Sequence, residues 1–192
     1  MICWYESRGR RRQPSSLIRA RAVPPNAPCL ARGLAGKLDR MEIKELGHLV
    51  LYVHNIERSA AFYGDVLGWK QLKATQDGPL GRMPVALFSS GRTHHELLLI
   101  EVGEDAQPLP RGRHVGLYHF GLKVGDSDDE LRAALRRCQE AGVNIVGTSD
   151  HTVSHSLYIL DPDGNEIELY VDVPGVSWDL EHVMAPVKAL AL

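Results

Sequence analysis

The chain has 192 residues, of which 44% are hydrophobic, and its formal net charge is −2 at pH 7. This length suits one domain with a sizeable core and leaves little room for a second full domain. The three cysteines lie far apart without Cys-x-x-Cys spacing, which argues against a disulfide framework and a cysteine zinc site. The apolar runs are strand-sized and fall far short of the ~20 residues that cross a bilayer. We therefore expect a protein of a reducing, cytoplasmic compartment with no membrane partner.

The first 40 residues differ in composition from the rest. They carry nine Arg or Lys against two acids, so they sum to +7 and the remainder of the chain sums to −9. Prolines interrupt them and no helical or strand period is sustained. An organelle-targeting peptide and a nucleic-acid-binding arm share this composition, but a dispensable tail or a mis-assigned start is the simpler interpretation. We predict a basic, disordered leader at 1–40, a domain at 41–175 and a C-terminal tail at 176–192, with no nucleic-acid partner.

Regular elements are expected from residue 47 onward. Asn55 is positioned to cap the first helix and Gly68 to end it. The elements expected in the first unit, in chain order, are a strand at 47–53, a helix at 56–68, strands beginning at residues 69, 83 and 93, and a Pro-rich linker at 103–114. The linker separates this unit from a second one.

The second unit has the same order of elements. A strand is expected at 118–124, a helix at 126–142, and strands at 143–148, 154–160 and 165–171. His48 and His119 each open the first strand of a unit, and each is followed by a valine five residues later. This internal repeat predicts an α+β fold in which two βαβββ units form a curved mixed sheet around a cavity.

A metal site can be built from the repeat. If the units pack as pseudo-twofold mates, their first strands lie side by side, and His48 and His119 face each other across the cavity. Alternation along the last strand puts Glu166 and Glu168 on one face, so that one carboxylate can meet both histidines. Two histidines and a carboxylate form the facial triad that suits Fe(II). A lone strand-initial histidine is more often structural, and the symmetry of the pair is what favours a metal site.

These motifs resemble the vicinal oxygen chelate superfamily, which includes glyoxalase I, methylmalonyl-CoA epimerase, fosfomycin-resistance and bleomycin-binding proteins and extradiol dioxygenases. The resemblance rests on GHLVLYV, YHFGLKV and DPDGNEIELY and covers residues 44–173. It implies that His48, His119 and Glu168 are the metal ligands. The chain looks most like the one-domain, CatE-like catechol 2,3-dioxygenases, although the fold alone does not choose the reaction.

Three further residues favour the dioxygenase branch of that superfamily. Tyr158 lies ten residues before Glu168, which is the spacing between the active-site tyrosine and the metal-binding glutamate in extradiol dioxygenases. His95 matches a histidine that opens the strand before the linker. Either His151 or His155 matches a histidine before the last hairpin, and we favour His151 because His155 is close to the Tyr158 strand. The alternative is that His95 decorates a solvent-facing strand end and that the Tyr158 ring fills the core.

The resemblance implies an Fe(II)-dependent enzyme that cleaves a catechol-type diol with O2, with Mn(II) or another divalent ion as alternative metals. In this interpretation His95 is the acid–base residue, Tyr158 holds a substrate or intermediate oxygen, and His151 donates to the catecholate. We expect a homodimer, because open-edged β units commonly pair. The tail, through Trp178, or a partner subunit is expected to complete the pocket.

Two other functions remain open. A glyoxalase-like or epimerase-like isomerase needs a further glutamate from the first unit, for which Glu96 and Glu101 are the candidates. Glu96 has the opposite strand parity to His95, and Glu101 lies at the strand's end. A metal-free binding module of the bleomycin-resistance kind has no use for all three ligand positions.

Overall fold

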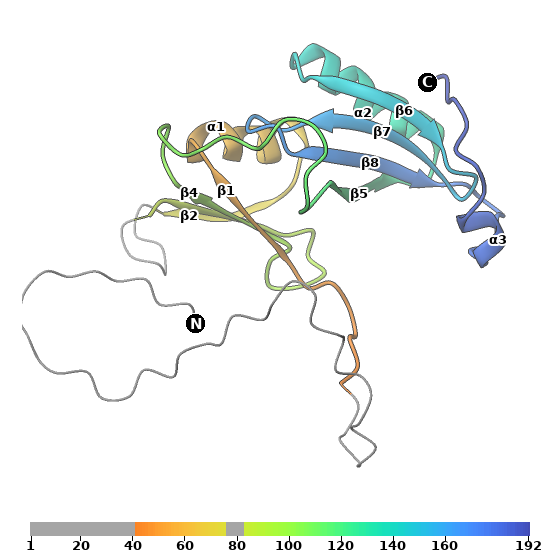
Figure 1. The fold of residues 1–192 in the computed structure, drawn as a ribbon, viewed down its shortest axis with the longest axis horizontal. Helices are drawn as coiled ribbons and strands as arrows, with labels where there is room; N and C mark the ends of the chain where they lie inside the picture. The colour runs from red at the N-terminus through yellow and green to blue at the C-terminus, as the bar shows by residue number, and fades with distance from the viewer. Residues whose placement is uncertain (1–40, 76–82) are drawn as a thin grey trace, which may run out of the picture. The chain divides into compact units, whose positions relative to one another are not determined.

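The computed structural model describes residues 41–75 and 83–192, so the predicted leader lies outside the described residues. Residues from Glu45 onward form one compact unit. The elements, in chain order, are β1 (Leu49–Val53), α1 (Ile56–Ala61), the π-helical turn η1 (Phe62–Val66), β2 (Gln71–Thr75), β3 (Val85–Phe88), β4 (Leu97–Glu101), β5 (His119–Gly125), α2 (Asp128–Glu140), β6 (Ile145–Asp150), β7 (Ser154–Leu160), β8 (Glu166–Asp172) and α3 (Leu180–Val183) (Figure 1). The two predicted βαβββ repeats are therefore present, and α3 is an additional short helix.

The strands form two four-stranded mixed sheets. Their orders are β1-β4-β3-β2 and β5-β8-β7-β6, so the first strand of each repeat is an edge strand that pairs in parallel with the last one. The other neighbours are antiparallel. The α+β prediction is confirmed, with two sheets in place of one continuous sheet.

No helix of the described ranges is long and apolar enough to span a membrane.

Helix α1 begins at the predicted residue, and α2 begins two residues after its predicted start at residue 126. The Asn55 side chain accepts a hydrogen bond of 2.9 Å from the Arg58 backbone N–H and so caps α1. The predicted helix at 56–68 corresponds to α1 followed by η1, and Gly68 follows with φ of 74°, which glycine adopts without strain. At the start of α2, the Glu130 carboxylate accepts from the backbone N–H of Asp126 and from the Ser127 hydroxyl. Ser127 is the N-cap residue, and the first helical residue is Asp128.

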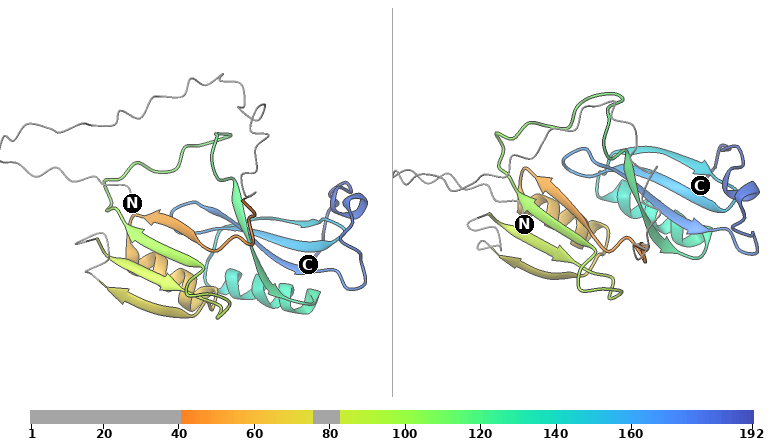
Figure 2. Two further views of the ribbon diagram at one scale, coloured as in Figure 1. Left: turned by 90° about the horizontal axis from the view of Figure 1, so that it is seen from below. Right: turned by 60° about the horizontal axis from the view of Figure 1, so that its bottom comes forward.

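Strand alternation separates the core from a polar sheet face. In β8, Ile167, Leu169 and Val171 are buried, whereas the residues between them are half-buried. These three side chains belong to one apolar core that also contains Val53 and Leu99 of the first repeat. Helices α1 and α2 lie on the same side of the two sheets (Figure 2). The intervening residues Glu166, Glu168 and Tyr170 therefore point to the face that the helices leave open.

The turn between β7 and β8 ties the second repeat to the first. Asp163 accepts from His54 Nδ1 at 2.6 Å and from the Arg58 guanidinium at 2.9 Å. The buried Tyr63 hydroxyl donates to Asp161 at 2.8 Å. His54 also contacts the Ala106 carbonyl at 3.1 Å through Nε2. His54 thus connects the start of α1 to the β7–β8 turn and to the linker.

The C-terminal tail returns to the second sheet. Lys188 forms an antiparallel bridge with Asp150 at the end of β6, and Leu190 and Leu192 pack against the core. Trp178 is 73% exposed and does not line the pocket between the two repeats. The last five residues of the tail therefore pack on the second sheet, and the expectation that Trp178 completes the active-site pocket stays a prediction.

Candidate metal and catalytic site

His119 and Glu168 meet on the open face of the second sheet. β5 and β8 run parallel with Gly121 opposite Glu168, which brings the His119 ring alongside the carboxylate. His119 Nε2 lies 3.3 Å from Glu168 Oε2, and Nδ1 lies 3.7 Å from Glu166 Oε1. Among the described residues, Nδ1 is a buried atom without a hydrogen-bond partner. An imidazole and a carboxylate are the donor types that a facial triad uses, so the contact is compatible with the predicted ligand roles of His119 and Glu168.

The two oxygens of Glu168 have different surroundings. Oε1 accepts from the Ser156 hydroxyl at 2.6 Å and from the Tyr158 hydroxyl at 3.2 Å. Oε2 is the oxygen that faces His119. Gly121 keeps that side open, because a Cβ there would lie 3.3 Å from the Tyr170 ring and 3.7 Å from Glu168 Oε2. The carboxylate is thus oriented by two hydroxyls and presents its other oxygen to the histidine.

Tyr158 links Glu168 to His151. His151 Nε2 lies 2.7 Å from the Tyr158 oxygen. A phenol has one proton, and Tyr158 donates it to Glu168, so the bond to His151 requires a proton on Nε2. Burial and the neighbouring Glu168 carboxylate raise the pKa of Tyr158 to about 12. Tyr158 therefore stays protonated at neutral pH and acts as a hydrogen-bond donor.

His155 faces the opposite side of its strand. Leu157 and Ile159, which share its parity, are buried in the core, and His155 Nδ1 contacts Asp128 at the start of α2 at 2.7 Å. His151 and His155 were open alternatives from the sequence. The structure brings His151, and not His155, to Tyr158.

Three histidines of the first repeat, His48, His94 and His95, form a separate cluster. The ring centroid of His48 lies 4.8 Å from that of His95 and 6.3 Å from that of His94. Burial, together with the two neighbouring imidazoles, lowers the pKa of His95. His95 is therefore neutral at pH 7 and able to accept a proton.

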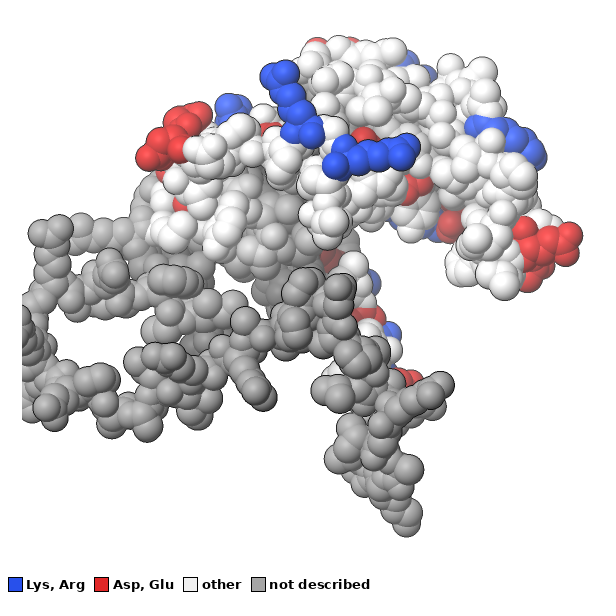
Figure 3. Space-filling model, in the orientation of Figure 1, with Lys and Arg blue, Asp and Glu red and all other residues white. Residues whose placement is uncertain are grey.

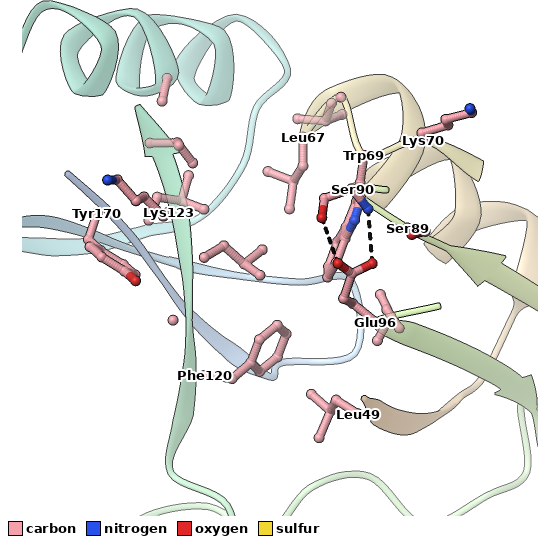
Figure 4. Close-up of a pocket in the computed structure, with 18 of the residues that line it drawn as sticks. Leu49, Leu67, Trp69, Lys70, Ser89, Ser90, Glu96, Phe120, Lys123 and Tyr170 are labelled. Carbon is pink, nitrogen blue, oxygen red and sulfur yellow. Dashed lines mark hydrogen bonds between the residues drawn. The ribbon is translucent and has the colours of Figure 1, made fainter. Parts of the chain in front are cut away.

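The predicted triad is not gathered into one group. Among the described residues, no three His, Cys, Asp or Glu side chains lie close enough together to hold a metal ion. His48 and His119 line the same pocket of about 1360 Å³ between the repeats, and Leu49, Trp69 and Phe120 give it an apolar wall (Figure 4). His119 and Glu168 lie in contact, and the assignment of His48, His119 and Glu168 as metal ligands stays a prediction.

Both candidate glutamates of the isomerase alternative are engaged in hydrogen bonds within the first repeat. Glu96 accepts from the Ser90 backbone N–H at 2.9 Å and from the Ser90 hydroxyl at 2.6 Å, as the dashed lines in Figure 4 show. Arg92 lies 3.5 Å away, and these partners hold the pKa of Glu96 below its usual value. Glu101 accepts from the Ile56 backbone N–H at 2.8 Å and thereby caps α1. Both carboxylates hold the local structure of the first repeat.

Sequence reasoning missed Ser156, Gly121 and Tyr170. The signal for Ser156 was its parity with Tyr158, two residues later on the same strand. Gly121 and Tyr170 could be connected only through the register between β5 and β8.

Charged side chains on the visible part of the described surface are scattered among uncharged ones (Figure 3). Surface charge on this face therefore does not mark the site, which is recognised by the hydrogen bonds and close contacts of its own side chains.

Paired βαβββ repeats with a polar open face define a class of α+β proteins. The family model described as the Glyoxalase/Bleomycin resistance protein/Dioxygenase superfamily matches residues 45–169. The chain belongs to this superfamily, whose members bind divalent metals. Family membership confirms the resemblance found in the sequence.

Individual relatives differ in reaction. A catechol-2,3-dioxygenase of Bacillus subtilis (strain 168) is 39% identical over 137 residues, which cover 71% of this chain and 45% of that protein. A lactoylglutathione lyase of Neisseria meningitidis serogroup A is 32% identical over 125 residues, covering 63% of this chain and 86% of that protein. The chain thus spans less than half of the dioxygenase it matches.

A solved structure supports the fold. The glyoxylase/bleomycin resistance protein/dioxygenase domain from Frankia sp. EAN1pec superposes with a TM-score of 0.57 at 21% identity, covering 69% of this chain and all of that one. At this identity the likeness concerns the arrangement of the repeats and leaves the reaction open.

Proposed function

We propose that the chain is an Fe(II)-dependent extradiol dioxygenase that opens the ring of a catechol-type substrate with O2. The observation that carries the proposal is the connected series His151, Tyr158, Glu168 and His119, in which successive polar atoms lie 2.7, 3.2 and 3.3 Å apart. A metal site alone would serve several reactions of the superfamily. A protonated phenol and an imidazole N–H beside it add the donors that a catecholate oxygen requires.

The proposed ligands are His48, His119 and Glu168. When bound, the metal supplies a template for both substrate oxygens and a path for electrons between the ring and O2. Mn(II) or another divalent ion is the alternative occupant. Ser156 and Tyr158 hold Glu168 Oε1, so that Oε2 faces the metal position together with His119.

The other proposed residues transfer protons and orient the substrate. Tyr158 keeps its proton at neutral pH, because its pKa is raised to about 12, and its hydroxyl holds a substrate oxygen. On substrate binding, the Nε2–H of His151, which here points to the Tyr158 oxygen, turns to the catecholate. His95, whose pKa is lowered, accepts a proton from the substrate hydroxyl and returns it to oxygen as the ring opens. Both atoms of O2 enter a ring-opened semialdehyde product.

The structure favours this reaction over isomerisation for a specific reason. An isomerase of the glyoxalase kind needs a further carboxylate from the first repeat, and Glu96 and Glu101 are both engaged in hydrogen bonds there. The lactoylglutathione lyase match keeps the isomerase as the competing function to be tested. We further propose a cytoplasmic homodimer that acts on a small aromatic diol.

The decisive test is anaerobic reconstitution with Fe(II), followed by oxygen-electrode measurements on a panel of catechols. We expect O2 uptake in equal amount to catechol consumed and a yellow product. The competing assay supplies Ni(II) or Zn(II) and a hemithioacetal. Isomerase turnover there, together with no O2 uptake for any catechol, would replace the dioxygenase proposal with the isomerase.

A further inference from the structure

The last residues of the chain lie along the end of β6. The Asp150 backbone N–H donates to the Lys188 carbonyl at 3.0 Å, and the Lys188 N–H donates back to the Asp150 carbonyl at 2.9 Å. The Thr148 hydroxyl donates to the Leu190 carbonyl at 2.7 Å. Leu190 and Leu192 pack against the core. Residues 188–192 therefore extend the second sheet beyond its edge strand.

The residue after this bridge is His151. Asp150 is thus bonded on one side to the tail, while its carboxylate accepts from the Thr152 backbone N–H at 2.7 Å on the other. His151 sits between these two anchors, and its own N–H donates to the Ser154 carbonyl at 2.9 Å. Its backbone position is consequently fixed by partners on both sides.

The turn that carries His151 is strained. Thr152 has φ of 71°, in the left-handed region that β-branched residues rarely adopt. Such a conformation persists only where the surrounding structure holds it. The Val153 N–H donates to the His151 carbonyl at 2.8 Å within the turn, and the bridge to Lys188 fixes the strand that leads into it. Loss of the bridge would leave Asp150 at an unpaired sheet edge, where backbone bonds open readily.

We propose that residues 188–192 are a positioning element that holds the His151 ring against the Tyr158 hydroxyl. Lys188 acts through its backbone and does not touch the site itself. The catalytic part of this inference rests on the proposed dioxygenase function, whereas the positioning of His151 can be measured without it.

The test removes one backbone donor. Lys188→Pro eliminates the N–H that bonds to Asp150, and Lys188→Ala is the matched control that keeps this N–H and removes the exposed side chain. Long-range 1H–15N spectra of the histidine rings are recorded on the full chain without added iron, with the His151 signals assigned from a His151→Gln variant. The ring signals of His54, which bonds to Asp163, report whether the fold is intact.

We expect Lys188→Pro to shift the His151 ring signals and leave those of His54 in place, and Lys188→Ala to change neither. With Fe(II) and catechol, kcat should fall about tenfold or more in Lys188→Pro with a smaller change in KM, because a reacting group displaced by about 1 Å costs up to 10²-fold. Unchanged His151 signals in a folded Lys188→Pro protein would overturn the inference.

Thr148→Val supplies a milder variant in case Lys188→Pro does not fold. It removes only the hydrogen bond to the Leu190 carbonyl and keeps the side-chain shape. The same His151 shift, smaller in size, is expected, and its absence would count against the positioning role. If the wild-type protein shows no ring cleavage at all, the dioxygenase proposal fails, and the His151 spectra still decide the role of the tail.

Discussion

At the scale of single residues, the contacts of Tyr158 explain why a spacing in the sequence was informative. Tyr158 and Glu168 are directly opposite each other in the antiparallel pair β7 and β8. The separation of ten residues is therefore the register of a hairpin, in which both side chains must point to the same face. The spacing by itself predicts only contact between the two side chains. Its relevance to catalysis comes from His151, which contacts Tyr158, and from His119, which contacts Glu168.

Tyr158→Phe tests the hydroxyl while keeping the ring. Loss of the donor should lower kcat by about 10²-fold, the usual size of a lost proton-handling group, with iron content unchanged. Steady-state oxygen uptake and elemental analysis on the same sample measure both quantities. Tyr52→Phe is the control, because Tyr52 is 66% exposed and remote from the hydrogen-bonded series. Full activity in Tyr158→Phe would remove the phenol from the mechanism.

His119→Ala and Glu168→Ala should each abolish tight iron binding and leave a soluble protein. Each removes one of only three proposed ligands, and the two side chains lie 3.3 Å apart. Metal content after anaerobic loading and gel filtration is the measurement, with exposed His114→Ala as the control. Stoichiometric iron in His119→Ala would eliminate the proposed ligand set.

His95→Ala separates proton transfer from metal binding. The variant should still bind iron and catechol and lose ring cleavage by about 10²-fold or more. Equilibrium binding of catechol to the iron-loaded variant, followed by single-turnover cleavage, distinguishes the two effects. Loss of iron together with activity would instead show that the cluster of His48, His94 and His95 supports the metal site.

At the scale of elements, the β7–β8 turn joins the two repeats through charge. Asp163 contacts His54, Arg58 and the Ser59 hydroxyl, all from the segment that starts α1. The hydrogen bond to Asp163, followed by contact with the Ala106 carbonyl, raises the pKa of His54 above its ordinary value of 6.5. The same Asp-Pro-Asp-Gly-Asn turn therefore both reverses the chain and docks on the other repeat.

The His54–Asp163 pair predicts a pH-dependent stability. Because the folded-state pKa of His54 is raised, its stabilisation is fully present below pH 6.5, the unfolded-state value, and is lost as pH rises through the folded value. The difference in Tm between wild type and His54→Gln should therefore be larger at about pH 5.5 than at about pH 8.5. Thermal unfolding of both proteins at each pH measures it. An equal difference at both pH values would show that His54 stays neutral in its contact with Asp163.

At the scale of the whole molecule, the residues proposed for function all lie in one compact unit. That unit spans Glu45–Leu192 and contains both repeats and the core that they share. The pocket between the repeats exposes an apolar wall and is bounded by histidines from each of them. A substrate with an aromatic ring suits such a wall, and the proposed ligands His48 and His119, one from each repeat, line this pocket.

A protein that starts at Met41 should fold and retain the kcat and KM of the full chain. None of the proposed ligands or catalytic residues precedes His48, and the compact unit begins at Glu45. Solubility, Tm and oxygen uptake of the two proteins, compared side by side, provide the measurement. Insoluble or inactive truncated protein would show that residues 1–40 contribute to the fold.

The sequence by itself determined the features that depend on local periodicity. Alternation in NEIELY puts Glu168 and Ile167 on opposite faces, Asn55 caps its helix, and the repeated order of elements specifies the α+β fold. Each of these is visible in the order and spacing of nearby residues, so it can be predicted before the cross-strand contacts that stabilise the strands are known.

Only the tertiary structure decided which distant side chains meet. From the sequence, both His151 and His155 are candidates for the histidine beside Tyr158. In the structure the His151 side chain contacts Tyr158, whereas the His155 side chain contacts Asp128. The separation of the strands into two sheets, and the return of Lys188 to Asp150, depend on contacts between segments far apart in the chain. Such contacts are set by packing of the whole core and by the register between strands, which no short pattern of residues encodes.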